Sequence, residues 1–193
     1  MKRFLFLLAI IFVSTTSFAQ TTWKVDPMHS RLGFGITHLG ISTVDGAFTR
    51  FMVTIKSEKS DFSDAVIELN AEASSINTGI TMRDDHLKSA DFFDVAKFPT
   101  ITFKSEGIKM ISKDKYQVTG NLTMHGITKS VTMELWYRGT ITNNTPQSKA
   151  RIAGFQLKGT LKRSDFGIGP TFPSTMLSEE VMIKADGEFI KSN

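Results

Sequence analysis

The chain has 193 residues, a formal net charge of +4, 40% hydrophobic residues and no cysteine. Without cysteine it has neither a disulfide framework nor a thiolate metal centre, so its folded state must depend on a hydrophobic core. The positive charge is dispersed, and the short basic clusters in SKARIAG and LKGTLKR are typical of solvated strand faces. Nucleic acid is therefore not expected as a partner.

The first element in chain order is an export signal. Residues 1–19 open with Lys2 and Arg3, continue with the apolar run FLFLLAIIFV and end in Ser-Phe-Ala. Because this run is too short to span a bilayer, the order predicts a signal peptide cleaved near Ala19. We expect one mature domain over residues 20–193, located in the periplasm or, as the alternative, secreted, and without stable membrane insertion.

Most of the mature chain alternates apolar and polar residues with period two, which is typical of half-buried β-strands. In RLGFGITH every second residue from Leu32 to His38 shares one face. The segments AVIELNAEA, TITFKS, YQVTGNLTM, SVTMELWYR, ARIAGFQLKGTLK and EVMIKADGEFI follow the same rule, except that Trp136 falls on the polar face. In VDGAFTRFMVTIKS, Phe48 and Phe51 fall on opposite faces, which predicts either a bulge or an apolar contact on the outer face.

Several half-polar strands joined by short turns predict an antiparallel sheet. A sheet of about eight such strands closes into a barrel because closure removes exposed edges. The expected fold is all-β, an extended antiparallel barrel with a short helical insertion. Its inward rows include small residues, namely Ala65, Ala71, Ala73, Gly120, Ala153, Gly159, Ala185 and Gly187. These either leave a dry cavity for an apolar guest or are filled by large side chains from opposite strands, and the pattern leaves both open.

The segment TMRDDHLKSADFFDVAKFPTITF interrupts the alternation. Met82, His86 and Leu87 are spaced to share a helical face, and a proline ends the excursion before the next strand. We interpret the segment as a helical connector at one end of the barrel or along its side. Phe92 and Phe93 then line or plug the mouth.

Polar residues on this connector are candidates for contact with a ligand head group. Arginine presents a fork of donors that suits phosphate or carboxylate, and we assign this role to Arg83 with Asp84 and His86. The alternative is that Arg83 pairs with Asp84, Asp85 or Asp91 and only holds the connector down.

Four motifs then occur in a fixed order: DPMHSRLGFGITH, RDDHLKSADFFD, FPTITF and LTMHGITKSV. With them the chain resembles the YceI-like family of exported polyisoprenoid-binding proteins over nearly the whole mature length. The resemblance implies an extended lipocalin-like barrel, an apolar tunnel for the tail of an isoprenoid or similar amphiphile, a homodimer, and no catalysis. Quinones, prenyl phosphates and fatty amides all fit this description of the guest.

Catalytic and metal sites are not favoured by the residues. The chain lacks the i,i+4 and HxH histidine spacings that suit a metal, and its histidines suit structural roles: His29, His38, His86 and His125. There is no GxSxG motif, and Asp26-Pro27 is typical of a turn that opens a strand. Neighbouring carboxylates such as Asp84 and Asp85 diverge on a helix or strand. We therefore expect no enzyme activity, no metal and no cofactor, although a bound lipid such as a polyisoprenoid or quinone is compatible.

The function predicted from the sequence is to bind, carry or sequester an apolar-tailed amphiphile, such as an isoprenoid, an isoprenoid quinone or a fatty-acid-like lipid. The predicted lining residues are Phe34, Ile36, Phe48, Leu69, Phe103, Leu122, Leu135 and Phe155. Two alternatives stay open. One is an exported stress-response or interaction module with a solid barrel, whose outer face at Trp136 and Arg138 binds a partner. The other is an enzyme that uses His86 and Asp84.

Overall fold

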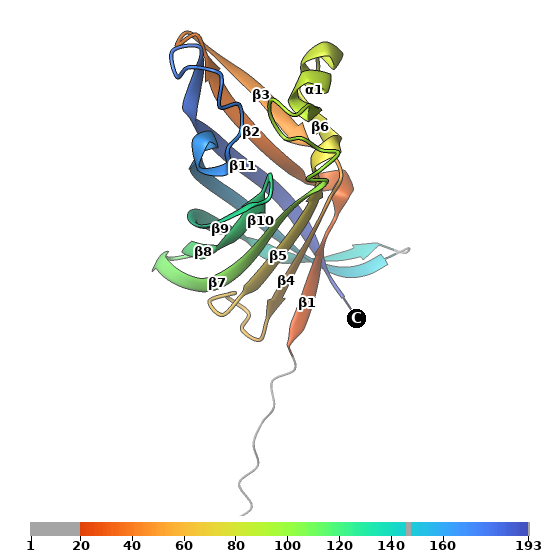
Figure 1. Ribbon diagram of the computed structural model, residues 1–193. Coiled ribbons are helices and arrows are strands. Elements are labelled where there is room, and N and C mark those ends of the chain that lie inside the picture. The colour runs from red at the N-terminus through yellow and green to blue at the C-terminus, as the bar shows by residue number, and fades with distance from the viewer. Residues whose placement is uncertain (1–19, 146–147, 193) are drawn as a thin grey trace, which may run out of the picture.

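The structure, a computed structural model, describes residues 20–145 and 148–192, so the predicted signal peptide lies outside the described residues. Within these residues the chain forms one short α-helix and eleven strands. Figure 1 shows how they are arranged. They are β1 (Thr21–Val25), β2 (Arg31–His38), β3 (Ser42–Phe48), β4 (Phe51–Ser57), β5 (Val66–Glu72), β6 (Ile76–Asn77), α1 (Thr81–Lys88), β7 (Thr100–Ser112), β8 (Lys115–Met124), β9 (Ile127–Thr145), β10 (Ser148–Lys162) and β11 (Leu177–Lys191).

The strands form one closed antiparallel barrel. Their order in the sheet is β1-β4-β5-β7-β8-β9-β10-β11-β2-β3-β6, and β1 also pairs with β11, which closes the ring. Because β1 and β2, β3 and β4, and β5 and β6 are successive halves of interrupted strands, the wall has eight strand positions. The expected all-β barrel with a short helical insertion is confirmed.

The three interruptions bend one side of the wall. The break between β3 and β4 falls at Thr49 and Arg50, whose N–H groups donate to the carbonyl and the hydroxyl of buried Ser75 at 3.1 Å each. The irregularity predicted near Phe48 and Phe51 is thus a break between two strands. The break also resets the alternation, so Phe48 and Phe51 both face the interior rather than opposite sides.

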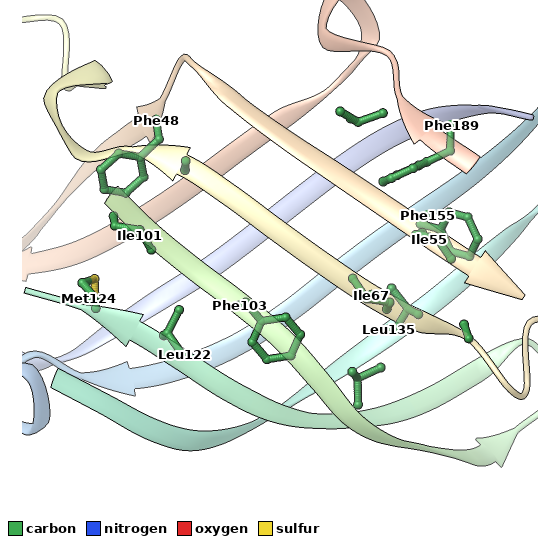
Figure 2. Packing of buried hydrophobic residues seen from close by; sticks show 14 of the residues in the cluster. Phe48, Ile55, Ile67, Ile101, Phe103, Leu122, Met124, Leu135, Phe155 and Phe189 are labelled. Atoms are coloured by element: carbon green, nitrogen blue, oxygen red, sulfur yellow. The ribbon is translucent and has the colours of Figure 1, made fainter. Parts of the chain in front are cut away.

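Inward rows from all around the wall make up the core. Figure 2 shows Ile101 and Phe103 of β7, Leu122 of β8 and Phe155 of β10 among the side chains that project into one interior. The strands β8 and β9 are joined by two residues, His125 and Gly126, with φ of 52° and 73°. Positive φ at both positions is the geometry of the tight turn that matches strand twist.

The two ends of the barrel differ. The β2–β3 turn (residues 39–41), the α1 connector (residues 78–99) and the β10–β11 loop (residues 163–176) gather at one end, which we call the mouth (Figure 1). The β4–β5 turn and the β7–β8 turn lie at the opposite end. Within residues 20–145 and 148–192, α1 is too short to cross a membrane, and no other helix is long and apolar enough to do so.

Candidate ligand cavity

A cavity of about 150 Å³ lies within the barrel, and its surface is almost entirely apolar. We call it the inner cavity. Seven of the eight lining residues predicted from the sequence border it: Phe34, Phe48, Leu69, Phe103, Leu122, Leu135 and Phe155. Since the interior is hollow, the solid barrel assumed by the interaction-module alternative is not what the chain forms. Contact of these residues with a ligand stays a prediction.

A second cavity, of about 320 Å³, lies between the barrel and the mouth, and we call it the outer cavity. It holds Ile36, the eighth predicted lining residue, together with Arg83, His86, Phe92 and Phe93. The α1 connector therefore covers the mouth as expected. Of the three residues predicted to share a helical face, His86 and Leu87 border this cavity, whereas Met82 is 81% exposed; Arg83, predicted at the mouth, borders the cavity.

The two cavities adjoin. They share five bordering side chains, namely Phe34, Phe48, Met124, Leu161 and Ile183. The rings of Phe34 and Phe48 lie 5.9 Å apart, and Phe93 of the connector packs edge-on against Phe48 at 5.6 Å. Aromatic side chains thus lie between an almost entirely apolar inner cavity and an outer cavity of mixed polarity.

An aromatic cluster, which we call the plug, packs against Phe155 of the inner cavity at the end away from the mouth. Phe62, in the β4–β5 turn, has a positive φ of 61° and is 1% exposed. Its ring packs against Trp23, Tyr137 and Phe155 at 5.4, 4.9 and 4.9 Å between centroids. Of these rings only Phe155 borders the inner cavity, so the plug packs behind the cavity wall; the border of the cavity also includes the polar residues Ser30, Arg31 and Asp186.

Hydrogen bonds hold this plug turn in place. The side chain of Asp64 accepts from the Ser57 hydroxyl at 2.5 Å and from the Glu58 N–H at 2.9 Å. Burial raises the pKa of Asp64, but these donors outweigh burial and keep it below the usual value. Sequence reasoning missed Phe62, although a single aromatic residue in the polar turn SEKSDFSD was a signal for it.

Arg83 lies at the mouth without a carboxylate partner. Among the described residues, its hydrogen bonds go to Thr78, with Nε donating to the hydroxyl at 2.7 Å and Nη2 donating to the carbonyl at 2.9 Å. The pairing with Asp84, Asp85 or Asp91 considered above is not formed. Arg83 is braced by a neutral residue, so its positive charge remains available to the outer cavity.

Asp84 differs from its predicted role. It is 7% exposed, borders neither cavity, and accepts from the N–H and the hydroxyl of Thr78 at 2.8 and 2.6 Å. The physical reason is helix phase, because position 84 points away from the face that carries Arg83 and His86. Asp84 therefore positions Thr78, which in turn orients Arg83.

His86 joins two elements of the mouth. Its Nε2 lies 3.0 Å from Asp91 Oδ2, and its ring packs edge-on against Phe92 and against Phe172 of the β10–β11 loop. The Gly169 N–H donates to the Asp91 carbonyl at 3.1 Å. The connector and the β10–β11 loop are thus fastened together, which leaves the opening between α1 and the β2–β3 turn.

Arg163 organises the β10–β11 loop and was not predicted. It is 4% exposed and donates to five backbone carbonyls, those of Ile168, Gly169, Phe172, Leu177 and Ser178, at 2.5 to 3.2 Å. It also pairs with Glu179 at 2.8 Å. A single guanidinium therefore donates hydrogen bonds to backbone carbonyls along this irregular loop. The rigid, planar guanidinium of arginine, with its several donors, suits this role.

The remaining histidines have different settings. His125 Nδ1 lies 2.9 Å from the Phe166 carbonyl and its ring contacts Phe98, so it occupies a hydrogen-bonding corner as expected. His29 is exposed instead, with Nδ1 2.8 Å from Asp26 Oδ2 and 4.0 Å from Glu188 Oε2. This hydrogen bond raises the pKa of His29 and lowers that of Asp26. The potential ligand atoms of Asp26, His29 and Glu188 lie within 4.8 Å of one another.

Interior glycines do not create the cavity in the expected way. A Cβ at Gly120 would lie 2.6 Å from the Phe103 ring, and one at Gly159 would lie 2.8 Å from Met133. These small residues accept large side chains from neighbouring strands. Ala185 and Gly187 do border the inner cavity. At some positions the space beside a small residue is therefore filled by a large side chain, and at others the small residue borders the cavity.

The ionisable groups around the outer cavity share one sign. Within residues 20–145 and 148–192, its border contains no aspartate or glutamate; its ionisable residues are His38, Arg83, His86, Lys162 and Arg163. Arg163 is neutralised by Glu179, whereas Arg83 and Lys162 form no ion pair with a described carboxylate. An apolar inner space below a basic outer space fits an amphiphile with an apolar tail and an acceptor-rich head.

These features define a class: an up-and-down antiparallel barrel that closes around an internal apolar cavity. The YceI-like domain family matches residues 23–189, and the chain belongs to this family. It is 34% identical over 184 residues to Protein YceI of Salmonella arizonae, with 94% of each chain covered.

Solved structures share the fold. The Campylobacter jejuni YCEI protein is 28% identical, with a TM-score of 0.72 over 81% of this chain and 90% of that one. A polyisoprenoid binding domain from Saccharophagus degradans, implicated in plant cell wall breakdown, is 15% identical, with a TM-score of 0.65 over 88% and 98% of the two chains. The second likeness concerns the fold alone.

Proposed function

We propose that the protein binds, carries or sequesters an apolar-tailed amphiphile, with the tail in the inner cavity and the head in the outer cavity. The observation that carries this proposal is the inner cavity itself, which is almost entirely apolar and adjoins an outer cavity with basic residues at the mouth. The Saccharophagus degradans domain that shares this fold is itself described as polyisoprenoid binding. The periplasm, reached after cleavage near Ala19, is the compartment we propose.

Burial of the tail supplies the driving force. Each methylene moved from water into an apolar site contributes about 0.8 kcal/mol, so about ten give on the order of 8 kcal/mol before ordering costs are subtracted. No covalent bond, metal or cofactor is needed for useful affinity. Tail burial alone discriminates weakly between isoprenoid, quinone and fatty-acid-like tails.

The head group is where selectivity arises. A phosphate or carboxylate in the outer cavity would accept from Arg83, and a hydrogen bond to a charged group is worth about 1.5–3 kcal/mol. His86 is a second polar contact at the mouth, held by Asp91. Asp84 has an indirect part in the proposal, because it fixes the Thr78 group that orients Arg83.

A binding titration tests the proposal. Geranylgeranyl phosphate and geranylgeraniol carry the same tail with and without an anionic head. Wild-type protein should bind both, and Arg83→Ala should weaken the phosphate by about tenfold or more while leaving the alcohol nearly unchanged. Lys88→Ala is the matched control, since this cation is on the same helix but pairs with Asp85 and borders neither cavity. Absence of binding to wild type would refute the proposal. Equal losses of affinity for the two ligands in Arg83→Ala would show that Arg83 only stabilises the connector.

A further inference from the structure

Exposed apolar side chains stand around the opening of the outer cavity. Leu39 and Ile41, in the β2–β3 turn, are 52% and 86% exposed. On the opposite side, Ile80 and Met82 at the start of α1 are 52% and 81% exposed. With Met176 of the β10–β11 loop, these five residues form what we call the apolar collar.

The collar is continuous with the cavity. Met176 borders the outer cavity, and its carbonyl accepts from the Leu39 N–H at 2.8 Å, which ties the loop to the β2–β3 turn. His38 and Arg83 both border the outer cavity, and each is the chain neighbour of a collar residue. Figure 1 shows the β2–β3 turn and α1 at the same end of the molecule. Large apolar groups in water thus surround the route by which a ligand reaches the interior.

We propose that the apolar collar docks on a phospholipid bilayer, so that an amphiphile passes between membrane and cavity without exposing its tail to water. The proposal rests on the proposed function. It follows from the energetics of transfer, because every methylene that crosses water must first lose the apolar contact that stabilises it. When the mouth lies in the interfacial region of the bilayer, the tail does not have to cross water, and this cost in free energy is avoided.

A bilayer suits the collar better than a protein partner does. The collar residues sit on the tips of separate elements that surround an opening, and such tips enter the soft headgroup and acyl boundary individually. The uncompensated cations Arg83 and Lys162 lie just below them, which complements the phosphates of anionic lipids. A flat, continuous apolar face, which a second copy of the chain would require, is not what these tips present.

Vesicles of equal parts phosphatidylethanolamine and phosphatidylglycerol provide the test. The variant Ile41→Asp/Met82→Asp places a charge at each side of the opening. The matched control is Met110→Asp/Ile111→Asp, because these residues are 46% and 51% exposed near the β7–β8 turn at the opposite end. Flotation measures binding to vesicles, and energy transfer measures uptake of geranylgeranyl phosphate from them.

The collar variant should lose vesicle binding by about tenfold or more and take up ligand correspondingly more slowly, whereas the control should match wild type. Ligand added in free solution should bind all three proteins equally, since no substituted residue borders either cavity. Equal vesicle binding by the two variants would overturn the docking proposal and leave the binding function standing. A change in oligomeric state specific to the collar variant would also overturn it, in favour of a second copy as the occupant. Failure of wild type to bind free ligand would refute the binding function instead.

Discussion

Phe103→Trp tests the inner cavity directly. Phe103 is 8% exposed, borders the inner cavity, and has its ring against the backbone at Gly120. Added ring atoms cannot move toward Gly120, so they must enter the cavity. An empty cavity of 150 Å³ costs about 3.6 kcal/mol at about 24 cal/mol per Å³, which is the upper limit of what filling it could recover.

The substitution should therefore leave stability within about 1 kcal/mol of wild type in urea unfolding, because overpacking costs about 1–3 kcal/mol only where no void exists. The free energy of ligand binding should change by more than the free energy of unfolding does. A tail displaced by two or three methylenes loses about 2 kcal/mol, or about 30-fold in Kd, as measured by titration with geranylgeraniol. Thr102→Trp is the control on the adjacent, outward-facing position. If Phe103→Trp binds as tightly as this control does, Phe103 does not border the bound tail.

Other predictions follow from single residues. Arg163→Leu should lower the free energy of unfolding by about 3–5 kcal/mol because it strands the carbonyls of an irregular loop, and Arg163→Lys should recover only part of this; a loss below about 1 kcal/mol in urea unfolding would contradict the assigned role. A Cβ at Gly46 would overlap the Phe34 ring, so Gly46→Ala should destabilise by about 1–3 kcal/mol, and an unchanged denaturation midpoint would show that the ring is free to move. The pKa of His29 should lie above its usual value of 6.5 by NMR titration and return toward it in Asp26→Asn. Because the folded pKa is raised, this contact stabilises the fold fully below pH 6.5 and the stabilisation is lost as pH rises through the folded pKa; a His29 titration unaffected by Asp26→Asn would count against this contact.

Much of the barrel could be predicted because period-two alternation reports directly on which side chains face inward. The predicted inward residues Phe34, Leu69, Phe103 and Phe155 all border the cavity for this reason. The break near Phe48 was also readable, since two large aromatic residues out of phase demand a local insertion.

The mouth was harder to predict. Arg83 and Asp84 are adjacent in sequence, and only the exact phase of a two-turn helix decides that one borders the cavity while the other is buried against Thr78. The loop around Arg163 has no periodicity at all. Its hydrogen bonds go to backbone carbonyls, which are present at every residue and leave no trace in side-chain pattern.

Contacts between residues that are distant in sequence were the other feature that could not be predicted. Glu188 approaches His29 only because β11 pairs with β1, so their proximity follows from barrel closure and not from any motif. Phe62 similarly gained its role from folding back into the barrel. A lone aromatic residue between acidic neighbours is compatible with an exposed turn as well, so the residue type alone could not decide.

The most direct test is native mass spectrometry of the protein purified from cells, followed by lipid extraction. We predict an added mass equal to one apolar-tailed amphiphile for each chain, displaced by excess geranylgeranyl phosphate. Chains that remain at their bare polypeptide mass, both on isolation and after incubation with such amphiphiles, would show that the hollow within the barrel does not serve as a binding site.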